Sequence, residues 1–143
     1  EAPGVAKIVQ VGQRDYSEEE RRLALSSPRV ELFDDFSLCT RRFAGETWNA
    51  VCDSIVERLP ERVYVSFDID VLAMEHCPAT GTPVPGGLTF NEAVWLVDRI
   101  AQSGRRIVGF DLCEVAPARE GTADANVGAR VLFRLCGIAL QTN

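Results

Sequence analysis

Residues 63–88 of the chain read VYVSFDIDVLAMEHCPATGTPVPGGL. The run from Val63 to Phe67 is β-branched and aromatic, which is typical of a buried strand. Side chains alternate along a strand, so we expect Asp68 and Asp70 to share one face. Two carboxylates on one face repel each other unless a cation lies between them, and hard divalent metals prefer such oxygen ligands. The alternative is that both acids cap a turn at the end of the strand.

Strand-like runs alternate with helical patterns along the chain. The expected strands lie at 6–11, 30–33, 63–69 and 107–113, and the expected helices at 17–25, 48–59, 89–101 and 126–140. This alternation predicts an α/β fold with a mostly parallel sheet and covering helices. The last helix is apolar almost all round, so we expect neighbouring elements to bury it. Ligands of such sheets bind beyond the carboxyl ends of the strands, where Asp68, Asp70 and Glu114 are expected.

The composition is that of one soluble domain. The chain has 143 residues, of which 46% are hydrophobic and 25% are charged. The net charge of −6 and the lack of a basic patch argue against nucleic acid and anionic membranes as partners. No apolar run has the length of a transmembrane segment.

The five cysteines and the start of the chain bear on where it functions. The cysteines are odd in number, lack the Cys-x-x-Cys spacing and lie mostly among apolar neighbours, which predicts reduced thiols in a cytoplasmic protein. The chain begins at Glu1, directly before a strand-like run, and its only methionine is Met74. We interpret the chain as a fragment or as one piece of a processed protein.

Two groups of residues together resemble the arginase/agmatinase/formiminoglutamase (ureohydrolase) family. The first is Phe67-Asp68-Ile69-Asp70 followed by Ala79-Thr80-Gly81-Thr82-Pro83 and Gly86-Gly87-Leu88, and the second is Phe110-Asp111-Leu112-Cys113-Glu114-Val115-Ala116-Pro117. The resemblance covers most of the chain but only the C-terminal half of the family's domain. It implies a three-layer α/β/α fold with a mostly parallel sheet, in which residues 1–143 form the C-terminal part of a single domain.

The resemblance also implies an activity and assigns residues to it. The family hydrolyses a guanidinium or amidine C–N bond with two Mn²⁺ ions per complete site. By resemblance, Asp68 bridges both metals, Asp70 ligates one, Glu114 holds the substrate's guanidinium and Thr82 lies beside the substrate. No further catalytic residue is assigned. The alternative readings are that Glu114 is an ordinary strand-end acid or a partner of Arg119, and that Thr82 is a turn hydroxyl.

The chain departs from the family pattern in two ways. Ala73 and Met74 stand where the family has Asp-Pro, which affects the loop but not the two expected ligands. The family's other metal ligands lie in Gly-Gly-Asp-His-type and Asp-Ala-His-x-Asp-type motifs, and neither occurs here. Two matched ligands are too few for a two-metal cluster, so we expect these 143 residues alone to be inactive. We expect His76, the only histidine, on a surface loop, and Asp111 in a structural role.

Two other functions are compatible with parts of the sequence. One is an inactive ureohydrolase homologue that serves as an assembly subunit. The other is a haloacid-dehalogenase-type phosphatase with magnesium, Asp68 as nucleophile and Asp70 as acid/base, which explains neither the loop at 80–88 nor Glu114. The family resemblance implies a small guanidino or amidino substrate and a homo-oligomer, trimer or hexamer. Arginine, agmatine, guanidinobutyrate and formiminoglutamate all remain candidate substrates.

Overall fold

The structure is a computed structural model that describes residues 4–116 and 123–142. Contacts divide the chain into two compact units, Glu1–Pro60 and Glu61–Asn143, and each is described by itself. No helix of the described residues is both long enough and apolar enough to cross a bilayer. That residues 1–143 belong to a single domain stays a prediction.

The N-terminal unit is built on two parallel strands, β1 and β2. Its elements are β1 (Ile8–Val11), α1 (Glu18–Ser26), β2 (Val30–Phe33), α2 (Asp35–Phe43) and α3 (Trp48–Val56). The predicted capping box opens α1: the Ser17 hydroxyl accepts from the Glu20 N–H, and the Glu20 carboxylate accepts from the Ser17 N–H. Both strands and helices α1 and α3 were predicted from the sequence, although α3 ends earlier than expected.

Helix α2 was not predicted. Its sequence, DFSLCTRRF, is short, and Leu38 is fully buried whereas Phe36 and Phe43 are exposed. The helix depends on a local signal instead, because the Asp34 side chain accepts from the Ser37 N–H and caps the first turn. A pattern search for an apolar face misses such a helix.

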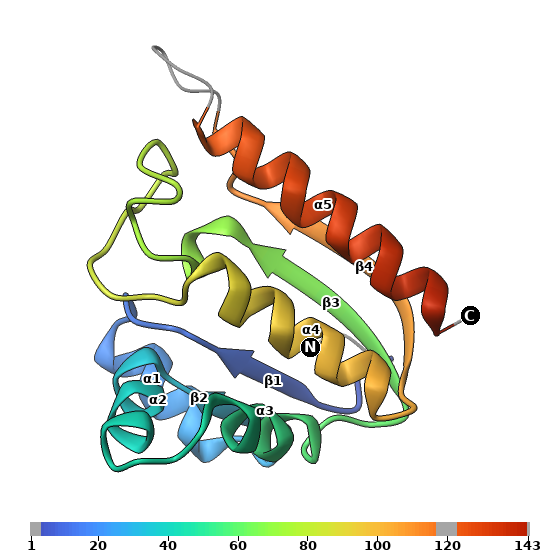
Figure 1. The fold of residues 1–143 in the computed structure, drawn as a ribbon. Coiled ribbons are helices and arrows are strands. Elements are labelled where there is room, and N and C mark those ends of the chain that lie inside the picture. The colour runs from blue at the N-terminus through green and yellow to red at the C-terminus, as the bar shows by residue number, and fades with distance from the viewer. Residues whose placement is uncertain (1–3, 117–122, 143) are drawn as a thin grey trace. The chain divides into compact units, whose positions relative to one another are not determined.

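The C-terminal unit places two helices against a second parallel pair of strands. Its elements are β3 (Arg62–Asp68), a 3-10 helix (Ile69–Val71), α4 (Phe90–Gln102), β4 (Arg106–Cys113) and α5 (Ala123–Gln141). Figure 1 shows α4 and α5 on the same side of this pair. Phe67 and Ile107 are buried, one on each strand, while Tyr64 and Val108 are exposed. The parallel strands and covering helices confirm the predicted α/β class.

The strand β3 ends at Asp68, which corrects one expectation. Asp68 and Asp70 do not share a strand face, because residues 69–71 form the 3-10 helix. The Asp68 Oδ1 accepts from the Asp70 N–H at 3.1 Å, and this local bond turns the chain out of the strand. Ile69 becomes fully buried in the turn.

Helix α5 also differs from its prediction. It begins at Ala123, and only one side of it is buried, through Val131, Leu135 and Ile138. On its other side Phe133 is 74% exposed and Leu140 is 77% exposed. The expectation that neighbours bury the helix all round is therefore wrong for the described residues, in which only β4 and α4 pack extensively against it.

The loop between β3 and α4 has a closed base. Ala73 donates its N–H to the Leu88 carbonyl (2.8 Å), and Leu88 donates to the Val71 carbonyl (2.9 Å). Gly87 sits at this base with φ +91°, and a Cβ there would lie 2.8 Å from the Leu72 carbonyl carbon and oxygen. The base of the loop therefore requires glycine for both conformation and space.

We expect Gly87→Ala to destabilise the protein more than Gly104→Ala. Both glycines have a positive φ, but nothing lies within 4 Å of a Cβ placed at Gly104. The left-handed backbone costs each variant about 1 kcal/mol. Gly87→Ala loses a further ~1–3 kcal/mol because the backbone of Leu72 must move. Free energies of unfolding in urea measure both values, and equal losses would contradict the close approach.

Candidate functional site

The strands β3 and β4 end at the same edge of the sheet. Asp68 is paired with Cys113 in the parallel register, and Glu114 follows at once. Figure 1 shows both strands pointing to one side, from which the loop after β3 departs. The structure thus brings Asp68 and Glu114 to one edge, with Asp70 in the turn beyond it. Thr82 lies exposed in the loop.

Asp68 acts as a turn cap in this structure. Its Oδ1 accepts from the Asp70 N–H, which is the simpler of the two roles considered from the sequence. Both aspartates are half-buried. A carboxylate has two oxygens, so capping by Oδ1 is compatible with metal ligation through Oδ2. The ligand role of Asp68 and Asp70 stays a prediction.

Glu114 has a strained backbone. Its φ is +59°, and it is the only non-glycine with positive φ among the described residues. The left-handed conformation costs an L-residue of this kind on the order of 1–2 kcal/mol. Such strain persists only where surrounding contacts enforce it, and it is concentrated at functional sites. Glu114, a candidate site residue from the sequence, is therefore also singled out by its backbone conformation.

The loop after β3 supplies contacts that hold Glu114. Thr80 is buried, and its hydroxyl donates to the Glu114 carbonyl at 3.0 Å. A Cβ placed at Gly81 would lie 3.1 Å from Glu114 Oε2. Residues 80 and 81 thus lie against both the backbone and the carboxylate of Glu114, and the glycine makes this approach possible.

The sequence reasoning missed the roles of two residues, Thr80 and Asp124. Thr80 belongs to the quoted motif, yet no role was assigned to it. Asp124 lies in the first turn of α5, is 0% exposed, and accepts the Ala79 N–H through Oδ2 at 2.9 Å. A signal was present in the sequence, because Asp124 is the only acid in α5.

Asp111 connects the two strands below the edge. Its Oδ1 accepts from the Ser66 hydroxyl (2.8 Å) and from the Cys113 thiol (3.2 Å). These hydrogen bonds lower the pKa of the Asp111 carboxyl. The same carboxylate raises the pKa of the Cys113 thiol and of the Tyr64 phenol. The contacts favour the structural role expected for Asp111; they strengthen with ionisation and are lost as pH falls through its lowered pKa.

Metal binding at this edge also stays a prediction. Asp68 and Asp70 carry the oxygen donors that Mn²⁺ accepts, and they lie in and beside one tight turn. Among residues 4–116 and 123–142, no three His, Cys, Asp or Glu side chains form a group able to hold a metal ion. His76 is half-buried, and the neighbouring Cys77 thiol donates to the Ile69 carbonyl. Arg119, considered as a partner of Glu114, lies outside the described residues.

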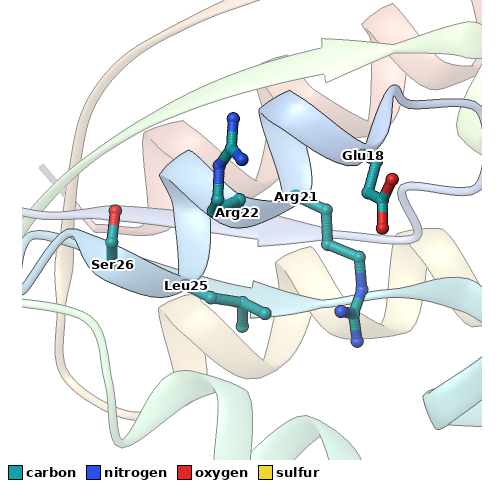
Figure 2. A pocket seen from close by; sticks show the side chains of 5 residues that line it. All are labelled: Glu18, Arg21, Arg22, Leu25 and Ser26. Carbon is teal, nitrogen blue, oxygen red and sulfur yellow. The ribbon is translucent and has the colours of Figure 1, made fainter.

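A surface hollow lies on α1, in the N-terminal unit. It is lined by Glu18, Arg21, Arg22, Leu25 and Ser26. These residues share one face of the helix, and Figure 2 shows Arg22 and Ser26 extending toward one edge of that face and Arg21 and Leu25 toward the other. These side chains do not converge on a common point, and none belongs to the motifs of the C-terminal unit. The hollow therefore carries no chemistry that the sequence indicates.

Comparisons with known proteins agree with the motifs. A family model described as the arginase family matches residues 1–137. An agmatinase of Pyrococcus horikoshii is 40% identical over 91 residues, which cover 61% of this chain and 30% of the relative. An N(1)-aminopropylagmatine ureohydrolase of Thermococcus kodakarensis is 45% identical over 87 residues, which cover 58% of this chain and 28% of the relative.

Solved structures share the fold of this chain. The solved structure of proclavaminate amidino hydrolase from Streptomyces clavuligerus aligns with a TM-score of 0.77 at 27% identity, covering 96% of this chain and 44% of that chain. The predicted arginase-like α/β fold is therefore confirmed. The chain spans less than half the length of each of these three proteins.

The strain at Glu114 gives a stability test that does not depend on activity. We expect Glu114→Gly to be more stable than Glu114→Ala by about 1 kcal/mol, because only glycine adopts φ +59° without strain. At an ordinary extended position the order is reversed by about 0.5–1 kcal/mol. Exposed Arg62 in β3, which is paired with Arg106 in the parallel register, is such a position, and Arg62→Gly and Arg62→Ala serve as the matched pair. Urea unfolding of the four variants measures their free energies of unfolding. If the alanine variant is the more stable at both positions, Glu114 is not strained.

Proposed function

Because the chain belongs to the arginase family, we propose that it forms the C-terminal part of a manganese-dependent ureohydrolase, which hydrolyses a guanidinium or amidine C–N bond. The observation that carries the proposal is Glu114, held in a left-handed conformation at the edge where β3 ends in Asp68. The relatives named agmatinase and N(1)-aminopropylagmatine ureohydrolase support a small guanidino substrate. They do not choose among arginine, agmatine, guanidinobutyrate and formiminoglutamate.

Glu114 would anchor the substrate. A carboxylate accepts two parallel N–H bonds from a planar guanidinium, so its orientation decides whether the fork can form. The Thr80 bond and the close approach at Gly81 fix the backbone and limit the side chain. Thr82 is exposed two residues after Thr80, and its hydroxyl would contact the substrate beside this anchor.

Asp68 and Asp70 would hold metal at the same edge. The tight turn through Ile69, with its Asp68 cap, fixes the position of Asp70 relative to the end of β3. When bound, Mn²⁺ supplies a Lewis acid and activates water at neutral pH. Two carboxylates do not complete a two-metal cluster, so the remaining ligands would come from outside these 143 residues. On this basis we propose that residues 1–143 alone are inactive.

The cell location and the assembly are also proposals. The five cysteines are odd in number and lack the Cys-x-x-Cys spacing, which supports a reducing, cytoplasmic location. The exposed apolar residues of α5, among them Phe133 and Leu140, offer surface for contacts in a homo-oligomer, trimer or hexamer. An inactive homologue acting as an assembly subunit is the remaining alternative, and the two experiments below separate it from an enzyme.

We expect Glu114→Gln in the intact protein to lower kcat/KM without releasing manganese. The variant keeps the size of the side chain but removes the charge that faces the substrate cation. Where the bound substrate closes the site from bulk water, removing one side of the resulting ion pair costs about 2–5 kcal/mol, or roughly thirtyfold to several thousandfold in kcat/KM. Elemental analysis and steady-state kinetics of the same preparation measure both effects.

The matched control is Glu61→Gln. Glu61 is exposed at the opposite end of the strand pair, directly before β3. Glu61→Gln should therefore change neither kcat/KM nor the manganese content. Lost manganese in Glu114→Gln would make Glu114 a metal ligand or a support of one. Unchanged kinetics would remove the substrate anchor, and a wild-type protein that binds manganese but turns over no guanidino compound would favour the inactive subunit.

We expect Asp70→Ala in the intact protein to lose at least one of two manganese ions and nearly all turnover. A carboxylate ligand supplies both charge and geometry, and alanine supplies neither. Asp98→Ala is the control, because Asp98 lies on α4 and bonds Gln102 in the next turn. Two metals per subunit with normal turnover in Asp70→Ala would show that Asp70 does not ligate.

A further inference from the structure

Asp124 is an unusual residue for its location. It is 0% exposed, and its Oδ1 has no hydrogen-bond partner among the described residues. Burying a carboxylate with a single hydrogen bond is costly. Part of that cost is offset because Asp124 lies in the first turn of α5, where the helix dipole favours a negative charge. An apolar residue would fill the position at lower cost, so the acid calls for a function.

The contact that Asp124 does make leads to the loop after β3. Its Oδ2 accepts from the Ala79 N–H at 2.9 Å, 45 residues away in sequence. The next residue, Thr80, donates its hydroxyl to the Glu114 carbonyl at 3.0 Å. Asp35, Thr80 and Asp124 are the buried polar or charged residues of the described chain. Asp124 and Thr80 therefore both take part in bonds that hold the loop after β3, at the adjacent residues 79 and 80.

The first turns of α5 also contact the segment after Glu114. Gly128 lies one turn beyond Asp124, and a Cβ placed there would lie 2.8 Å from Val115 Cγ1. Helix α5 thus packs closely against the residue that follows Glu114, while Asp124 holds the loop on which Thr80 is carried. Glu114 is fixed between these two attachments, which explains how a strained φ of +59° persists at an exposed residue.

We propose that Asp124 is a positioning residue for Glu114. It fixes Ala79, so that Thr80 and Gly81 hold Glu114 in the conformation that presents its carboxylate. This inference rests on the proposed function, in which Glu114 anchors the substrate. Displacing a positioned group by about 1 Å can cost on the order of a hundredfold in rate. Removing the hydrogen-bond acceptor at Asp124 should therefore displace Glu114 and so weaken its contact with the substrate.

The test uses variants of the intact protein. Asp124→Leu removes the acceptor and keeps a branched side chain of similar shape, and Asp124→Ala is a second variant in case the first does not fold. We expect either to lower kcat/KM by about tenfold to a hundredfold, with manganese content unchanged. Asp124→Asn keeps an oxygen for the Ala79 N–H and should stay within about threefold of wild type.

Thr142→Val is the control for a general loss of stability. The Thr142 hydroxyl accepts the Ile107 N–H at 3.1 Å and so ties α5 to β4 at the end of the helix far from Asp124. This variant should lower the free energy of unfolding and leave kcat/KM unchanged. A fall in kcat/KM equal to that of Asp124→Leu would reduce Asp124 to one more stabilising contact of α5.

A double-mutant cycle with Glu114→Gln separates this inference from the proposed function. If Asp124 acts through Glu114, Asp124→Leu should cause less than about threefold further loss in the Glu114→Gln background. Losses that multiply would overturn the positioning role while leaving the substrate anchor intact. No effect of Glu114→Gln by itself would instead remove the substrate anchor on which this inference rests, and a wild-type protein that turns over no guanidino compound would overturn the proposed function.

Discussion

The parallel pairing of β3 with β4 is the constraint on which the candidate site depends. Its register sets Asp68 opposite Cys113, so the first residue after each strand emerges at one edge. A shift of the register would move Glu114 along the edge and break the Ser66–Asp111 bond at the same time. The polar cluster around Asp111 therefore links the register to the geometry of the edge. Buried Phe67 and Ile107 hold the opposite face against the helices.

The loop after β3 transmits this geometry to Glu114. Its base is closed by the bonds of Ala73 and Leu88, and its far side is fastened by Ala79 and Thr80. Glycines stand where the backbone must approach something closely: Gly87 against Leu72, and Gly81 against Glu114. The departure at Ala73-Met74 does not open the loop, because Ala73 is buried and contributes its N–H to the base.

Much of this could be predicted from the sequence, for identifiable reasons. Strands, amphipathic helices and capping boxes are local patterns, which is why α1 and α4 begin where Ser17 and Thr89 indicate. The motifs located the acids at the strand ends. The fine geometry was not predictable, because the Asp68 cap ends β3 one residue before ideal alternation would. The Asp124–Ala79 contact spans 45 residues, and no local pattern contains it.

Charge connects these observations. Asp68, Asp70 and Glu114 gather acids at one edge, and Asp124 places a fourth, buried carboxyl directly against the loop that borders it. Like charges brought together in partly buried positions raise the free energy of the protein unless cations lie nearby. The described partners of Asp68, Thr80 and Asp124 at this edge are backbone groups, which orient these three side chains. A metal at the aspartates and a guanidinium at Glu114 would each reduce this repulsion. In the proposed function, these two cations would bind at the edge where β3 and β4 end, and the register of the two strands would set their separation.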